Sequence, residues 1–374
     1  MSKLENLMRP HMAKIATYHG VDPSAELARE AGIKPEDVIR LNANENPYGA
    51  FEKIADALTG LELHLYPDTQ QRKLRAALSE YMGQPAERII AGAGGDEIID
   101  LLMRLFVDPG QKVLDCEPTF GMYAFSARQA DAKIVSVDRN SSWDIDIPTM
   151  REEIDDSARI VFLASPNNPT GNLLTESDAR ALLDTGIVVC VDETYYEFSG
   201  SSLSHLLDEY ENLVILRSFS KWAGIAGLRV GYAIASENLI QHLLDIKQPY
   251  NINIAGEAAV LAALEHRNEL LERARSLVDQ RKRLEAAIDE LKGVSYYPSE
   301  GNFLLCSFDR RTAEEAYVGL AQHGIFVRRF SQDVLSNSLR ISAGTPEQTD
   351  RVIAALRTVV SRRSRQLAFY LAPT

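Results

Sequence analysis

Short apolar runs alternate with helix-like segments between about residues 54 and 234, and this alternation limits the possible folds more than any other feature. Residues 160–163 and 186–191 form two of these runs, each rich in β-branched side chains and too short for a typical helix. Strands that alternate with helices form a mostly parallel sheet, which helices cover on both faces. The sequence therefore predicts an α/β fold.

The pattern changes after about residue 255. Residues 267–291 place apolar side chains at helix spacing along one long stretch. Strand-like runs follow at residues 294–297, 302–308, 325–330 and 338–343, with a helix-like segment at 313–323. We therefore predict an N-terminal arm with part of a small domain (1–45), a large domain (46–254) and a compact α+β small domain (255–374).

Composition excludes several classes of partner. The 374 residues carry a formal net charge of −13, which argues against nucleic acid and anionic membranes as partners. No apolar run approaches the length of a membrane span, and residues 1–15 lack the apolar region of a signal peptide. Cys116, Cys190 and Cys306 are odd in number and lie in apolar strands, so we expect buried thiols in a cytoplasmic protein. The seven histidines show no metal-ligand spacing, and no metal is expected.

A lysine flanked by phosphate-binding side chains is the strongest chemical motif. Ser218-Phe-Ser220-Lys221 is followed eight residues later by Arg229. A lysine amine can lose its proton near neutral pH when it is buried or lies beside another cation, and can then bond an aldehyde. Serine hydroxyls and a guanidinium suit a phosphate dianion. The motif favours a lysine that holds pyridoxal 5′-phosphate, and a solvated lysine after a strand is the alternative.

An acid ends the apolar run at residues 186–191. Asp192 would lie at the carboxyl end of a strand, where open α/β sheets bind ligands. A carboxylate there can keep the pyridine nitrogen of the cofactor protonated. The alternative is an acid that caps the next helix.

A turn with two prolines follows the run at residues 160–163. Pro166 and Pro169 flank an asparagine pair, and each proline restricts both its own backbone and the residue before it. Asn168 is therefore held at a strand end, where its amide can donate to the phenolate oxygen of the cofactor, with Tyr195 as a second donor. A plain turn would need only one Asn-Pro pair.

A glycine-rich turn precedes another helix pattern. The residues are Gly92-Ala-Gly94-Gly95-Asp96-Glu97, and apolar side chains at helix spacing follow them. Free backbone N–H groups and the positive end of a helix dipole bind phosphate. A turn that only starts a helix is the alternative. The spacing differs from the dinucleotide pattern G-x-G-x-x-G.

Together these motifs resemble the histidinol-phosphate aminotransferase family, one of the fold-type I aminotransferases that use pyridoxal phosphate. The resemblance covers almost the whole chain and includes residues 41–49 (LNANENPYG), 66–68, 94–97, 118–123, 165–171, 192–195, 218–231 and 339–345. It implies a large domain that binds the cofactor, a smaller α+β domain, and a cytoplasmic homodimer with shared active sites that acts in histidine biosynthesis.

The resemblance also implies a role for each matching residue around the cofactor. Lys221 would bond the aldehyde and later move a proton between the substrate carbon and the cofactor. Asp192 would pair with the pyridinium, Asn168 and Tyr195 would hold the ring oxygen, and Phe120 would stack on the ring. The phosphate would be held by Gly95, Asp96, Ser218, Ser220 and Arg229, and by Tyr66 of the other subunit.

Substrate contacts follow from the same resemblance. Arg340 resembles the arginine that binds the substrate anion, and Arg328 resembles a second one, although Arg329 beside it leaves that assignment open. Tyr18 matches an N-terminal tyrosine that closes over the substrate phosphate of the neighbouring subunit, but Thr17 replaces the usual proline before it. Trp222 is bulkier than the expected alanine, and would either reshape the substrate side of the pocket or pack against the small domain.

The predicted reaction moves an amino group between histidinol phosphate with its keto partner, imidazole acetol phosphate, and the pair glutamate and 2-oxoglutarate. Three alternatives stay open: an aromatic amino acid aminotransferase, a threonine-phosphate decarboxylase, and a cofactor-binding regulator without turnover. Motif spacing does not separate the enzymes, because specificity depends on pocket shape and on a few contacts.

Overall fold

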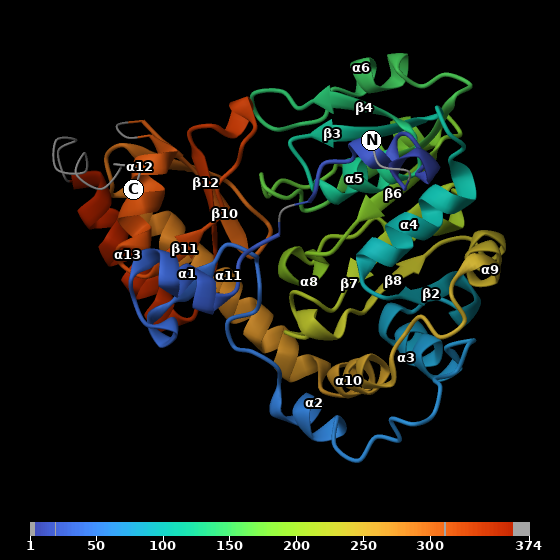
Figure 1. Cartoon of the computed structure of the whole chain (residues 1–374), viewed down its shortest axis with the longest axis horizontal. Coiled ribbons are helices and arrows are strands. Elements are labelled where there is room, and N and C mark those ends of the chain that lie inside the picture. The colour runs from blue at the N-terminus through green and yellow to red at the C-terminus, as the bar shows by residue number, and fades with distance from the viewer. Residues whose placement is uncertain (1–3, 19, 310–311, 362–374) are drawn as a thin grey trace.

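A seven-stranded sheet forms the centre of the larger part of the molecule (Figure 1). The computed structural model describes residues 4–18, 20–309 and 312–361. The strand order is β2-β8-β7-β6-β5-β3-β4, and only β8 runs against its neighbours. The strands are β2 (Ile89–Gly92), β3 (Lys112–Glu117), β4 (Lys133–Asp138), β5 (Ala158–Ala164), β6 (Val188–Asp192), β7 (Leu213–Ser218) and β8 (Gly231–Ile234). The predicted α/β class with a mostly parallel sheet is confirmed.

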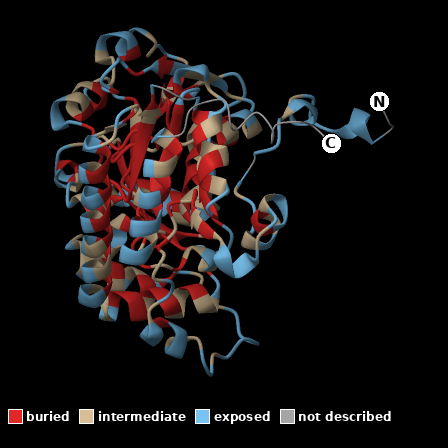
Figure 2. Ribbon diagram, turned by 90° about the vertical axis from the view of Figure 1, so that its left-hand side faces the viewer, coloured by how far each residue is buried: buried red, intermediate tan, exposed pale blue. Residues whose placement is uncertain are grey.

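Side chains alternate between the two faces of this sheet, and both faces are buried. In β5, Ile160 and Phe162 face one apolar cluster, whereas Val161 and Leu163 face the other. A strand with two buried faces reads as a continuous apolar run, which explains the runs in the sequence. Figure 2 shows this buried sheet between helices whose outer faces are exposed.

Two sets of helices cover the sheet. One face packs against α4 (Gly95–Phe106), α5 (Met122–Gln129) and α9 (Glu237–Ile246). The other packs against α3 (Arg72–Met82), α6 (Ile147–Glu152), α7 (Glu176–Leu183), α8 (Tyr196–Ser199) and α10 (Ile254–Glu265). Outside these layers, α2 (Glu52–Ala57) lies against α10.

A second, smaller core lies beside the first (Figure 1). A three-stranded antiparallel sheet has the order β12-β10-β9, and β1 pairs in parallel with β11. These strands are β1 (Ile39–Leu41), β9 (Val294–Tyr297), β10 (Phe303–Phe308), β11 (Ile325–Val327) and β12 (Ser338–Ser342). Its helices are α1 (Ser24–Ala31), α12 (Ala313–Ala321) and α13 (Pro346–Ser361).

One long helix, α11 (Arg267–Asp289), joins the two cores. Leu270 and Leu277, in its first half, belong to the cluster of the seven-stranded sheet, and Leu284 and Ile288 belong to the smaller cluster. The predicted strand at 325–330 is shorter than expected, because β11 ends at Val327 and only an isolated bridge continues it. The three-part domain division stays a prediction.

The three cysteines are buried free thiols, as predicted. Among the described residues, no helix combines the length and the apolar character that crossing a membrane requires.

Candidate active site

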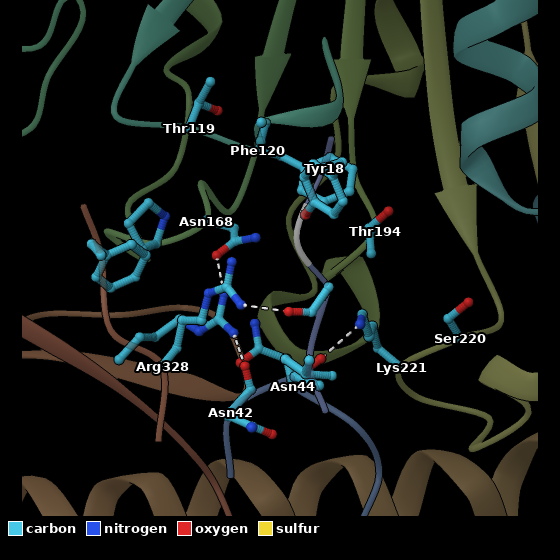
Figure 3. Close-up of a pocket in the computed structure, with 18 of the residues that line it drawn as sticks. Tyr18, Asn42, Asn44, Thr119, Phe120, Asn168, Thr194, Ser220, Lys221 and Arg328 are labelled. Carbon is cyan, nitrogen blue, oxygen red and sulfur yellow. Dashed lines mark hydrogen bonds between the residues drawn. The ribbon is translucent and has the colours of Figure 1, made fainter. Parts of the chain in front are cut away.

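A cavity of about 910 Å³ lies between the two cores, at the carboxyl ends of the parallel strands. Thirteen of the fourteen predicted site residues line it, and Tyr66 is the exception. The thirteen are Tyr18, Gly95, Asp96, Phe120, Asn168, Asp192, Tyr195, Ser218, Ser220, Lys221, Arg229, Arg328 and Arg340. Figure 3 shows Lys221 and Arg328 on opposite sides of Asn44, with Phe120 and Tyr18 on another wall.

Lys221 follows β7 and points its amine into the cavity. Its Nζ donates to the backbone oxygen of Ala43, 2.9 Å away (Figure 3). Burial, assisted by the positive charge of Arg340, lowers the pKa of the Lys221 amine to about 8. The amine therefore deprotonates close to neutral pH, as a nucleophile for an aldehyde must.

Asp192 ends β6 at the floor of the cavity. One carboxylate oxygen accepts from the Tyr123 hydroxyl at 2.7 Å, and the other accepts from the backbone N–H of Thr194 at 3.0 Å. Burial raises the pKa of this carboxyl group. A buried carboxylate with these neutral donors would gain from a cation, such as a protonated ring nitrogen.

The amino end of α4 and the segment after β7 form an anion-binding corner. Arg229 has a left-handed backbone (φ 56°), and its guanidinium contacts the Asp96 carboxylate at 2.8 Å. Gly94 has a positive φ of 81°, which favours glycine, and a Cβ atom there would also lie 2.5 Å from that guanidinium. Ser218 and Ser220 line the same side. Backbone N–H groups, hydroxyls and a guanidinium therefore converge, as a phosphate group requires.

Arg340 and Arg328 are opposite each other in an antiparallel bridge, with both backbone N–H···O distances at 3.0 Å. Residues directly opposite project their side chains from the same face. Arg340 is buried, and it donates to the Asn168 side-chain oxygen and to the backbone oxygen of Asn42. Burial lowers the pKa of the Arg340 guanidinium to about 10.

Arg328 and Arg329 differ in their contacts. Arg329 forms an ion pair with Glu314 at 2.7 Å and lies over the Tyr317 ring. Arg328 donates to the backbone oxygen of Gly20 at 3.3 Å and has no carboxylate partner among the described residues. The contacts favour Arg328 over Arg329 as the arginine for an anionic ligand, and this role stays a prediction.

Sequence reasoning assigned no role to residues 42–44, although they lie in a quoted motif. The backbone oxygens of Asn42 and Ala43 accept from Arg340 and Lys221, and the Asn44 amide donates to the Tyr195 hydroxyl at 2.9 Å. Asn44 also has a left-handed backbone (φ 53°). The only hint in the sequence was the pair of asparagines, Asn42 and Asn44, within this motif. Their contacts could not be predicted, because they join positions more than 150 residues apart in the chain.

One expectation differs from the structure, and two others concern a second subunit. Tyr18 lines the cavity of its own chain, with its ring 6.0 Å from that of Phe125, and its predicted role toward the neighbouring subunit stays a prediction. Trp222 adopts neither expected role, because it is fully buried and packs against Tyr81 and Phe219 in the larger core. The cross-subunit role of Tyr66 stays a prediction. Among the described residues, no cluster of three or more acidic, histidine or cysteine side chains could hold a metal.

Comparison with known proteins gives a consistent result. Residues 36–356 match the family described as aminotransferase class I and II. The chain is 44% identical to a histidinol-phosphate aminotransferase of Roseiflexus castenholzii, over 96% of this chain and 99% of the relative. It is 41% identical to a chloroplastic histidinol-phosphate aminotransferase of Arabidopsis thaliana, over 94% of this chain and 86% of the relative.

A solved structure extends the likeness to the fold. The histidinol-phosphate aminotransferase of Sinorhizobium meliloti superposes with a TM-score of 0.84 at 25% identity, covering 95% of this chain and 97% of that one. That protein was solved in complex with pyridoxal 5′-phosphate.

Proposed function

Since the chain belongs to the histidinol-phosphate aminotransferase family of class I and II aminotransferases, we propose that it transfers an amino group from histidinol phosphate to 2-oxoglutarate, and the reverse. The products are imidazole acetol phosphate and glutamate. The observation that carries this proposal is the placement, in one cavity, of a lysine with a lowered pKa beside two arginines without carboxylate partners among the described residues.

The residues of the cavity fit pyridoxal 5′-phosphate. Such a ligand needs an amine for its aldehyde, a carboxylate for its ring nitrogen and an anion-binding corner for its phosphate. Lys221, the buried Asp192 and the corner at Gly94 and Arg229 supply all three. When bound, this cofactor withdraws electrons from the substrate carbon that loses its proton.

Each of these side chains has a defined task. Lys221 offers a neutral amine near pH 8, and the same Nζ can take a proton from a substrate carbon and return it. Asp192 would hold a proton on the ring nitrogen by its negative charge. Phe120 lies in the wall, where it would exclude water and cover the ring face of the bound cofactor.

Arg340 and Arg328 account for the substrate charges. Histidinol phosphate carries a phosphate group, and 2-oxoglutarate carries two carboxylates. A guanidinium binds either group through two parallel N–H···O hydrogen bonds. We infer that these arginines serve phosphate and carboxylate in turn, and that Tyr18 covers the same end of the cavity.

The assembly and its location are also part of the proposal. We propose a homodimer in which Tyr66 of one subunit completes the phosphate corner of the other. Its high exposure in the single chain, at 79%, supports this arrangement. The three buried free thiols support a reducing compartment such as the cytoplasm.

The decisive experiment is a comparison of single half-reactions. The enzyme with bound cofactor is mixed with histidinol phosphate, phenylalanine or O-phosphothreonine, and the rate at which the visible cofactor band disappears is measured. We expect histidinol phosphate to react fastest by a wide margin. A faster reaction with phenylalanine would indicate an aromatic aminotransferase, and release of carbon dioxide from O-phosphothreonine would indicate a decarboxylase. No change with any of them would indicate a protein without turnover.

A further inference from the structure

Asn44 is one of the most tightly fixed side chains in the cavity. It is only 1% exposed, and its left-handed backbone is held from both sides. Its N–H donates to the Ser342 hydroxyl at 3.0 Å, and its carbonyl oxygen accepts from the Asn302 amide at 3.1 Å. Both partners lie in or beside strands of the smaller core, so Asn44 has the rigidity that a positioning residue needs.

The direction of the Asn44 amide follows from Ser342. The Ser342 oxygen already accepts from the Asn44 backbone N–H, so its hydroxyl hydrogen needs an acceptor in this buried place. The Asn44 side-chain oxygen, 2.8 Å away, supplies that acceptor. The amide nitrogen therefore points the other way, toward the Tyr195 hydroxyl at 2.9 Å.

This contact determines where the Tyr195 hydrogen can point. A phenol has one hydrogen to donate, and here its oxygen accepts from Asn44. Among the described residues, the Tyr195 hydroxyl has no acceptor for its own hydrogen. Burial raises the pKa of this hydroxyl, while Arg340 and the hydrogen bond from Asn44 act in the opposite direction. The hydrogen is thus available to a ligand in the cavity.

Asn168 shows the same arrangement on the neighbouring side. Its side-chain oxygen accepts from Arg340, which leaves the amide N–H groups as the free end. Asn44 thus orients Tyr195, and Arg340 orients Asn168. In both cases a hydrogen-bond donor remains free for a ligand in the cavity.

We propose that Asn44 is a positioning residue that directs the Tyr195 hydroxyl hydrogen to the ring oxygen of the bound cofactor. The inference rests on the proposed function, because it needs pyridoxal 5′-phosphate in this cavity. A hydrogen bond donated to the ring oxygen stabilises that oxygen as an anion. It therefore lowers the pKa at which the bound cofactor loses the proton beside this oxygen. The Asn44 hydrogen bond strengthens Tyr195 as a donor.

The test is a pH titration of the visible band of the holoenzyme, without substrate. Asn44→Gly removes the amide and keeps the left-handed backbone free of strain. The pH midpoint of the band should rise by about half a unit to one unit, which is the size of one ordinary hydrogen bond. Tyr195→Phe should raise the midpoint as well, and adding Asn44→Gly to Tyr195→Phe should cause no further rise.

Asn46→Ala is the matched control. Asn46 lies in the same segment and is buried, but its amide donates to the backbone oxygen of Trp222 rather than to Tyr195. It should lower thermal stability without moving the midpoint. The inference is overturned if this control shifts the midpoint equally, if Asn44→Gly leaves it unchanged, or if the rise persists in the Tyr195→Phe background. A fall in the midpoint would show that Asn44 accepts the Tyr195 hydrogen.

The proposed function fails separately. If the wild-type protein binds no pyridoxal 5′-phosphate, both proposals fall. If the wild-type protein binds the cofactor and reacts with histidinol phosphate, but the variants give one of the results that overturn the inference, only the role of Asn44 is wrong.

Discussion

Burial lowers the pKa of two lysines, Lys221 and Lys247, but their surroundings differ, and this difference allows a test of Lys221. Lys247 donates to the backbone oxygens of Gln248 and Pro249 and does not line the cavity. Borohydride reduction of the holoenzyme followed by peptide mapping should place the cofactor on Lys221 alone. Lys221→Ala should abolish the adduct and nearly all turnover while cofactor still binds through the phosphate corner. An adduct on Lys247 would contradict the assignment.

The lowered pKa of Lys221 predicts a distinct pH profile in the cofactor-free protein. Its amine loses its proton at a pH of about 8, whereas the ordinary value is 10.5. Only the neutral amine reacts with an acylating reagent, so labelling should increase with pH and level off above about 8. Lys112 is the internal control, because its hydrogen bond with Asp155 raises its pKa. Mass spectrometry of the two peptides checks the order, and equal profiles would show that burial does not tune Lys221.

Asp192 can be compared with a second buried acid. Asp115, on β3, is 1% exposed and burial also raises its pKa, but it does not line the cavity. Asp192→Asn should keep the shape of the site and lower turnover by at least about a hundredfold, or about 2.7 kcal/mol of transition-state stabilisation. Asp115→Asn should change turnover little. If Asp192→Asn retained more than about a tenth of the activity, another group would hold the ring proton.

Some of these residues could be found from the sequence, and others could not. Lys221, Asp192 and Asn168 each follow an apolar run, and the carboxyl ends of parallel strands meet at one edge, so their convergence was predictable. The contact between Asn44 and Tyr195 spans 151 positions and depends on how two cores pack. No local pattern encodes such packing, and the same limit hid the position of Trp222.

At the scale of elements, a buried ion pair ties the ends of two strands that carry site residues. Glu193 follows Asp192 at the end of β6, and Arg217 precedes Ser218 in β7. Their side chains are 1% and 2% exposed, and two guanidinium nitrogens contact one carboxylate oxygen at 3.0 and 2.8 Å. The Glu193 carboxylate also accepts from the backbone N–H of Leu203 at 2.7 Å. The pair therefore fixes the spacing of the strand ends.

Breaking this pair should be costly, because it leaves a buried charge without its partner. Arg217→Met should lower the free energy of unfolding by about 3–5 kcal/mol, measured by urea denaturation of the cofactor-free protein. Arg180→Met removes one partner of an exposed ion pair with Glu209, and it should change the free energy of unfolding little. The double variant Glu193→Gln with Arg217→Met should recover part of the loss. Equal losses for Arg217→Met and Arg180→Met would contradict the role of the buried pair.

The strands of the large sheet were predictable at this scale because burial of both faces makes each of them a short, continuous apolar run. The ends of the strands were less predictable. The sequence predicted a strand as far as residue 330, but β11 ends at Val327; Arg328 makes only one bridge, and its side chain turns toward Gly20. A polar side chain that serves a site interrupts the pattern by which strands are recognised.

At the scale of the whole molecule, one loop exposes several large apolar side chains to solvent. Leu63, Leu65 and Tyr66 are 73%, 51% and 79% exposed, and the Tyr66 ring stacks on Tyr250 at 4.3 Å. Exposed apolar patches of this kind mark interaction sites. In the homodimer that we propose, a second copy of the chain would cover this loop, and Tyr66 would reach the phosphate corner across the interface.

Cofactor retention should then depend on assembly. A tyrosine hydroxyl that donates to a phosphate makes a charge-assisted hydrogen bond, so Tyr66→Phe should weaken cofactor binding by about tenfold to a hundredfold. Dilution of the wild-type enzyme should likewise release cofactor, because binding and assembly are linked. Equilibrium dialysis measures the first effect, and fluorescence of the released cofactor measures the second.

A mixed dimer provides the sharpest test of shared sites. Tyr66→Phe and Lys221→Ala protomers are combined, subunit exchange is confirmed by mass, and activity is assayed at limiting cofactor, where the Tyr66→Phe homodimer is weak. If Tyr66 acts across the interface, one site carries both lesions and the other carries neither, so each mixed dimer regains about half of the wild-type activity. If Tyr66 acts within its own chain, every intact lysine is paired with a Tyr66→Phe lesion. The mixed dimer then stays at half the activity of the Tyr66→Phe enzyme, and the shared site is excluded.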